Sequence, residues 1–234
     1  MLLDLFEDFF AGKIAITDLV LNFVFVAVVV LFALSSHEAA HGYAAYKLGD
    51  PTAQRMGRLT LDPRAHLDPV GTIFMLIFGF GWAKPVPVNA RYFKNPRKDM
   101  AVTAIAGPVC NLLISFISLI IYRVLLSAFG NVNFQSQFFF NIVIYTLELF
   151  SYCHFLNLYL AIFNLIPIPP LDGSRLMFIF LPDKYYFGLM RYERYIKILF
   201  FILLYMGIIS GPLSFVAGKV SDLMGFIVGL VPGL

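Results

Sequence analysis

The sequence predicts an all-α, polytopic membrane protein with about four transmembrane helices, a re-entrant loop or hairpin at residues 70–89, and a C-terminal apolar segment left unassigned. Composition is the first observation behind this prediction. The chain is 60% hydrophobic and 13% charged, with a mean hydropathy of +0.82, whereas soluble domains are about half apolar and about one quarter charged. The second observation is that several apolar stretches reach the roughly 20 residues needed to cross a bilayer as a helix.

Four spans are expected, at residues 18–48, 101–128, 138–166 and 198–212. Gly49-Asp50-Pro51 follows the first span and is a typical helix stop. The apolar residues after 212 are interrupted by glycine, proline and charged residues, so their crossing is left open. We expect residues 1–234 to form a single integral-membrane domain, with its core at about 18–175.

The apolar stretch at residues 70–82 is too short for a fifth span. Its thirteen residues would extend about 20 Å as a helix, against a hydrocarbon core of about 30 Å. The following "AKPVPVNA" contains two prolines in alternation, which favours extended chain. A re-entrant loop or hairpin is therefore predicted for residues 70–89, packed against protein or a wet cavity.

The distribution of charge predicts the orientation. Residues 47–99 hold nine lysines and arginines against four acids, whereas the 130–137 loop holds no charge. The positive-inside rule then places residues 47–99 and 175–197 in the cytoplasm. We expect a multi-pass protein of the cell membrane, in contact with the lipid bilayer, with its polar motifs near the cytoplasmic side. A net charge of +3 is no indication of a nucleic-acid partner.

The most informative motif is "HEAAH", residues 37–41, at the end of the first apolar span. A helix places His37 and His41 on one face at metal-binding distance, with Glu38 close enough to act on a water molecule as a general base. The alternative is a pair of histidines hydrogen-bonded inside a helix bundle. Ionisable residues within an apolar span favour the functional interpretation.

Two histidines require a third protein ligand for a catalytic zinc ion. Asp172 in "NLIPIPPLDGSR" is the best candidate, because it follows a span at the same predicted membrane side. The alternative role for Asp172 is the N-cap of a following helix. His66, in the loop "RAHLDP", is a possible accessory residue, and a structural role for it is the alternative. His154 is a further, less favoured ligand candidate.

These motifs together resemble the site-2 protease family of intramembrane zinc metalloproteases, peptidase M50, in its compact bacterial branch without PDZ or CBS domains. The resemblance rests on HEAAH, on "GPVCN" (107–111) and on "NLIPIPPLDG" (164–173). It extends to "LDPRAHLDPVGT" (61–72) and "GWAKPVPVN" (81–89), and it covers residues 30–175 with the motifs in the family's order.

The resemblance implies a zinc metalloendopeptidase with one Zn²⁺ per chain, which hydrolyses peptide bonds in or near transmembrane segments of membrane proteins. His37, His41 and Asp172 match its zinc ligands, and Glu38 matches its catalytic glutamate. Asn111 and Asn164 match asparagines that we expect to bind substrate or the oxyanion. The alternative is a non-catalytic zinc-binding scaffold or a metal transporter. The substrate's identity, the trigger for cleavage and the oligomeric state are not predicted.

Overall fold

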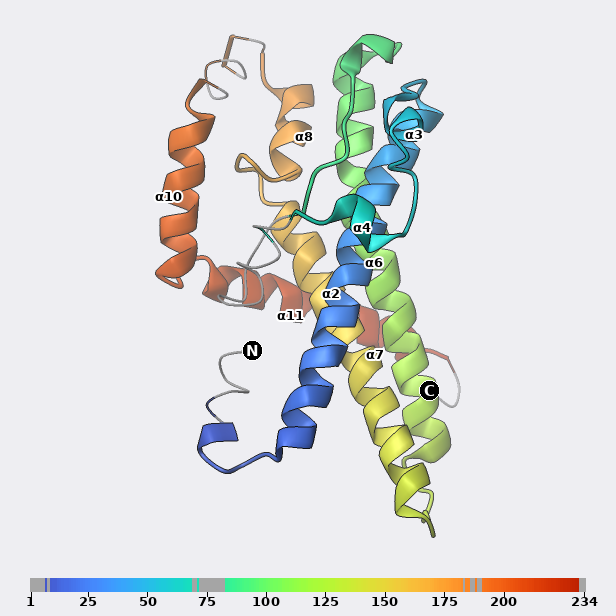
Figure 1. Ribbon diagram of the computed structural model, residues 1–234. Coiled ribbons are helices and arrows are strands. Elements are labelled where there is room, and N and C mark those ends of the chain that lie inside the picture. Colours follow the sequence, from blue (N-terminus) through green and yellow to red (C-terminus); the bar gives the residue numbers. More distant parts are fainter. Residues whose placement is uncertain are drawn as a thin grey trace.

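A computed structural model describes most of the chain (Figure 1). The described residues are 7, 9–68, 71, 83–182, 184, 185, 188 and 191–231. All regular elements among them are helical, as predicted.

Three long helices form the body of the molecule and pack side by side (Figure 1). They are α2 (Ile16–Lys47), α6 (Pro96–Phe129) and α7 (Gln137–Asn164). At 1.5 Å per residue, each is longer than a hydrocarbon core of about 30 Å. Their bounds confirm the first three predicted spans to within a few residues, because long apolar periodic segments leave little freedom in the choice of element.

These helices expose apolar side chains and bury polar ones, the reverse of a soluble bundle. On α2 the exposed side chains recur every four residues at Ile16, Val20, Val24 and Val28, each at least 46% exposed. This spacing forms one continuous helix face, which suits contact with lipid. The opposite faces carry the buried polar residues, so the interior of the bundle is where polar chemistry is available.

The connection from α2 to α6 lies at one end of the bundle. It contains the short helices α3 (Thr52–Arg55) and α4 (Pro63–His66) and the 3-10 turn η1 (Ala90–Tyr92). Most of the predicted hairpin, residues 72–82, lies outside the described residues. Its second half, residues 83–89, is extended as predicted, and Ala83 forms an isolated antiparallel bridge with Leu67.

The predicted fourth span at 198–212 is wrong. Helix α10 (Glu193–Tyr205) ends after 13 residues, about 20 Å, and a turn follows in which Gly207 has a φ of +74°. Helix α11 (Ser210–Gly229) then begins, and it is the fourth helix long and apolar enough to cross a membrane. Pro212 lies in its first turn, where a missing N–H costs no hydrogen bond. Figure 1 shows α11 running across the other three long helices.

A buried histidine connects α11 to the bundle. His154 of α7 is 2% exposed, and its Nδ1 lies 3.0 Å from the carbonyl oxygen of Ser115 on α6. A carbonyl only accepts, so Nδ1 carries the proton and Nε2 accepts from the Ser221 hydroxyl of α11 at 3.1 Å. The Ser115 hydroxyl oxygen also lies 2.9 Å from Nδ1, so His154 is held between α6 and α11 and is structural.

We expect Ser221→Ala to lower the free energy of unfolding by about 0.5–2 kcal/mol, because it leaves His154 Nε2 buried without its donor. Thermal unfolding in detergent would measure the loss. Ser214→Ala, at an exposed position of the same helix, is the matched control. Equal melting temperatures for the two variants would contradict this role for His154.

Candidate metal centre

Helix α2 presents the two histidines as its periodicity predicts. Both are buried, at 5% and 8% exposure, and the Nε2 atoms of His37 and His41 lie 3.0 Å apart. Residues four apart in a helix stand one above the other on the same face. The pair is therefore placed by local geometry alone.

Asp172, which is 131 residues after His41 in the sequence, lies next to the two histidines. Its Oδ2 lies 3.0 Å from His37 Nε2 and 3.2 Å from His41 Nε2. Asp172 also occupies the N-cap position of α8 (Gly173–Phe180), but its side chain makes no capping hydrogen bond. The carboxylate lies against the histidines instead, so its contacts do not support the capping role.

The donor set fits a zinc ion. His41 Nδ1 lies 2.7 Å from the carbonyl oxygen of Thr103, so it carries the proton and leaves the Nε2 lone pair directed at His37 and Asp172. Two imidazole nitrogens and one carboxylate oxygen are a ligand set typical of catalytic zinc. Ligand atoms 2.0–2.1 Å from a tetrahedral zinc ion lie about 3.3 Å from one another, close to the three separations observed.

The carboxylate of Asp172 remains ionised at neutral pH. Burial alone would raise its pKa, but without a metal ion His37 and His41 can carry protons on Nε2, and their hydrogen bonds and charge then outweigh burial and hold the pKa well below its usual range. A bound metal ion would take the place of these protons. An ionised carboxylate is the form that binds a metal.

Helix α6 passes unusually close to this cluster. A Cβ atom at Gly107 would lie 2.4 Å from His41 Nε2 and 2.7 Å from His37 Nε2. Only a glycine therefore permits α6 to lie against the two rings. Glycine is otherwise unfavourable in a helix interior, by about 1 kcal/mol relative to alanine.

Glu38 lies beside the cluster formed by His37, His41 and Asp172 rather than in it. It is rotated by about 100° around α2 from His37, and its Oε2 accepts the backbone N–H of Val86 at 2.8 Å. The sequence analysis did not anticipate a role for Val86. The signal that could have indicated one is Pro85 and Pro87 on either side of it, because proline has no N–H and Val86 is therefore the one backbone donor of this tripeptide. The other carboxylate oxygen, Oε1, has no hydrogen-bond partner among the described residues.

The two asparagines differ in their surroundings. Asn111 is one turn after Gly107 on the same face of α6, is fully buried, and has no hydrogen-bond partner for either side-chain atom among the described residues. His37 Nδ1 is buried without a partner in the same sense. Asn164, the last residue of α7, donates to the carbonyl oxygen of Leu160 at 2.9 Å and is partly exposed.

His66 is not brought into the cluster. It is 1% exposed, and its Nε2 donates to the carbonyl oxygen of Thr60 at 2.8 Å. The three side chains that group as a possible metal site in the described part of the chain are His37, His41 and Asp172. The structural alternative for His66 is the one its contacts support.

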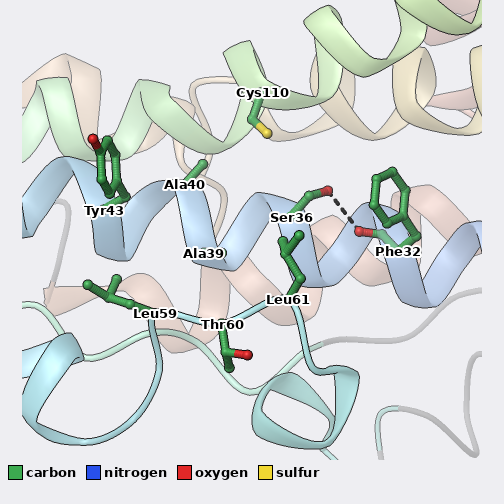
Figure 2. A pocket seen from close by; sticks show the side chains of 9 residues that line it. All are labelled: Phe32, Ser36, Ala39, Ala40, Tyr43, Leu59, Thr60, Leu61 and Cys110. Carbon is green, nitrogen blue, oxygen red and sulfur yellow. Dashed lines mark hydrogen bonds between the residues drawn. The ribbon is translucent and has the colours of Figure 1, made fainter.

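An open, mostly apolar groove of about 510 Å³ lies on a neighbouring face of α2 (Figure 2). Small residues, Ser36, Ala39 and Ala40, form its floor, and the 59–61 segment forms one side. Figure 2 places Cys110 of α6 across from Ser36 and Ala40. The groove therefore extends along α2 from Phe32 to Tyr43, past the turn that carries Glu38.

Gly107→Ala is expected to lower the zinc content of the purified protein well below that of wild type, because the new methyl group occupies the space of the imidazoles. The same overlap should lower the melting temperature of the metal-free protein, an effect that the better helix propensity of alanine offsets only in part. Metal analysis and thermal unfolding measure the two effects. Gly218→Ala, where nothing lies within 4 Å of the new Cβ, is the control, and equal zinc content in both variants would contradict the close approach.

Comparisons with known proteins assign the chain to a family. The model of peptidase family M50 matches residues 25–209. "Putative zinc metalloprotease YwhC" of Bacillus subtilis is 42% identical over 179 residues, 76% of this chain and 79% of that protein. "Putative zinc metalloprotease Rip2" of Mycobacterium tuberculosis is 29% identical over 158 residues, 64% of this chain and 55% of that protein. No solved structure matches the chain. The chain therefore belongs to peptidase family M50, the site-2 protease family of intramembrane zinc metalloproteases.

Proposed function

We propose that His37, His41 and Asp172 hold the zinc ion and that Glu38 is the general base for hydrolysis of a peptide bond. The observation that carries this proposal is the convergence of the three ligand atoms, within 4.8 Å of one another, from residues up to 135 positions apart. Without a cation, two imidazole lone pairs and a carboxylate buried together are unfavourable.

The chemistry divides between the metal and the chain. A bound zinc ion supplies Lewis acidity, which polarises a carbonyl group and makes water acidic. Glu38 accepts the proton of the attacking water through its free oxygen and passes it to the leaving amine. Asn111 is suited to bind the substrate carbonyl, because its buried amide lacks a partner among the described residues. Asn164 contributes a second amide at the end of α7.

A scaffold or transporter accounts less well for this arrangement. A scaffold needs the three ligands but has no use for a partly exposed carboxylate beside them. A transporter needs polar groups that form a path across the membrane. The buried polar residues of α6 and α7 instead include His154, whose ring nitrogens are both engaged by serines.

We further propose that the substrates are transmembrane segments, unwound locally at the site, and that the groove of Figure 2 accommodates the unwound segment. A helix hides its amides in internal hydrogen bonds, so unwinding is required before cleavage. The positive charge of residues 47–99 favours a site near the cytoplasmic side. The whole chain is proposed to act as one integral-membrane domain.

The first experiment is zinc per chain in detergent-purified protein. We expect about one zinc ion in wild type and a large loss in Asp172→Ala, because two histidines alone bind zinc weakly. Glu38→Gln should retain zinc while its peptidase activity falls by about 10²-fold or more. Full zinc retention in Asp172→Ala would remove this residue from the ligand set, and an active Glu38→Gln would remove Glu38 from catalysis.

The groove is tested by filling it. Ala39→Phe is expected to raise KM for a membrane-protein substrate by about tenfold, because the ring would occupy space needed by the unwound segment. Zinc content should be unchanged. Val28→Phe adds the same ring to the exposed side of α2 outside the groove and is the control. An unchanged KM in Ala39→Phe would place the substrate elsewhere.

A further inference from the structure

The side chain proposed as the general base is held by a single backbone donor. Val86 N–H lies 2.8 Å from Glu38 Oε2. Pro85 and Pro87 flank Val86 and have no N–H. The N–H of Val86 is therefore the sole backbone donor of residues 85–87, and Glu38 accepts its hydrogen bond.

The segment that carries this donor is fixed on both sides. Before Val86, the N–H of Lys84 donates to the carbonyl oxygen of His66 at 2.8 Å. The buried guanidinium of Arg58 donates to the carbonyl oxygens of Lys84 at 2.7 Å and Pro85 at 3.0 Å. Beyond Val86, the N–H of Asn89 donates to the carboxylate of Asp50 at the end of α2.

The segment also packs directly on the helix that carries Glu38. The Val86 side chain is 8% exposed, and a Cβ atom at Gly42 would lie 3.2 Å from Val86 Cγ1 and 2.7 Å from Leu59 Cδ2. Gly42 is four residues after Glu38, hence on the same face of α2. Its missing side chain allows the extended chain to approach near enough for the Val86–Glu38 hydrogen bond.

We propose that the Val86 N–H is the group that positions Glu38, and that Arg58 is a positioning residue that acts through Val86. The hydrogen bond holds Oε2, selects one conformation of a side chain with three rotatable bonds, and leaves Oε1 to receive the proton. A base held in place before substrate binds loses less freedom when it reacts. This inference rests on the proposed role of Glu38.

The same contacts limit where a substrate strand could pair. The N–H and carbonyl of Lys84, the carbonyl of Pro85 and the N–H of Val86 are already engaged. The carbonyls of Val86 and Pro87 and both groups of Val88 have no partner among the described residues. Strand addition to this segment would therefore use residues 86–88 and leave the Glu38 contact intact.

The test compares Val86→Pro, which removes the N–H, with Val86→Ala, which keeps it and shortens the side chain. We expect kcat to be about tenfold lower in Val86→Pro than in Val86→Ala, a fraction of the rate that a general base contributes. KM and zinc content should be equal in the two variants. Equal kcat values would overturn the proposal.

A double-mutant cycle separates positioning from a structural role. Asp at position 38 is one methylene shorter, so it should not reach Val86, and Val86→Pro should lower kcat by less than about twofold in a Glu38→Asp background. The same tenfold loss in both backgrounds would show that Val86 serves the fold and not Glu38.

Arg58→Lys provides a second route if Val86→Pro does not fold. A single nitrogen of Arg58, Nη2, donates to both carbonyls. Lysine keeps the charge, but its Nζ lies one bond closer to the backbone than Nη2, so kcat should fall at least threefold with zinc content and KM unchanged. A wild-type kcat would overturn the proposal. An active Glu38→Gln would instead refute the proposed function itself, whereas an inactive Glu38→Gln beside equal Val86 variants would refute this inference alone.

Discussion

The structure depends on one constraint. The carboxylate of Asp172 and the imidazoles of His37 and His41 share one buried site, and their lone pairs point toward a common centre. Buried polar groups without partners are costly, and a buried charge needs a compensating partner. Helix α2 supplies two of the groups by its own periodicity, and Asp172 reaches them 131 residues after His41. Gly107 allows α6 to lie against the two imidazole rings without displacing them. A metal cation is the partner that satisfies all three groups at once.

Successive faces of α2 separate the tasks of the site. One face carries the histidines toward α6 and Asp172, and the next carries Glu38 toward Val86. The groove occupies a third face, with Ala39 and Ala40 in its floor. Consecutive residues of the HEAAH motif thus face the metal, the extended segment and the groove, because each residue turns the helix by about 100°. A single helical turn therefore brings ligand, base and groove together.

The remainder of the bundle separates a polar interior from an apolar surface. Exposed apolar side chains on α2 suit lipid, while Asn111, Ser115, His154 and Asn157 lie inside. Such polar residues are costly to bury without partners, and Ser115 and Ser221 satisfy both ring nitrogens of His154. Asn111, near the metal cluster, is left without a partner among the described residues. The contrast is consistent with a structural role for His154 and with a role in binding for Asn111.

The sequence by itself determined the helical class, the first three spans and the His37–His41 pair, because these follow from local periodicity and hydropathy. It also placed Asp172 among the candidates. Only the tertiary structure decided that this carboxylate faces the histidines rather than capping α8, and that Thr103 orients His41. The break at Gly207, which separates α10 from α11, and the bond from Val86 to Glu38 also came from the structure. These features depend on backbone conformation and on contacts between distant residues, which a pattern along one chain does not specify.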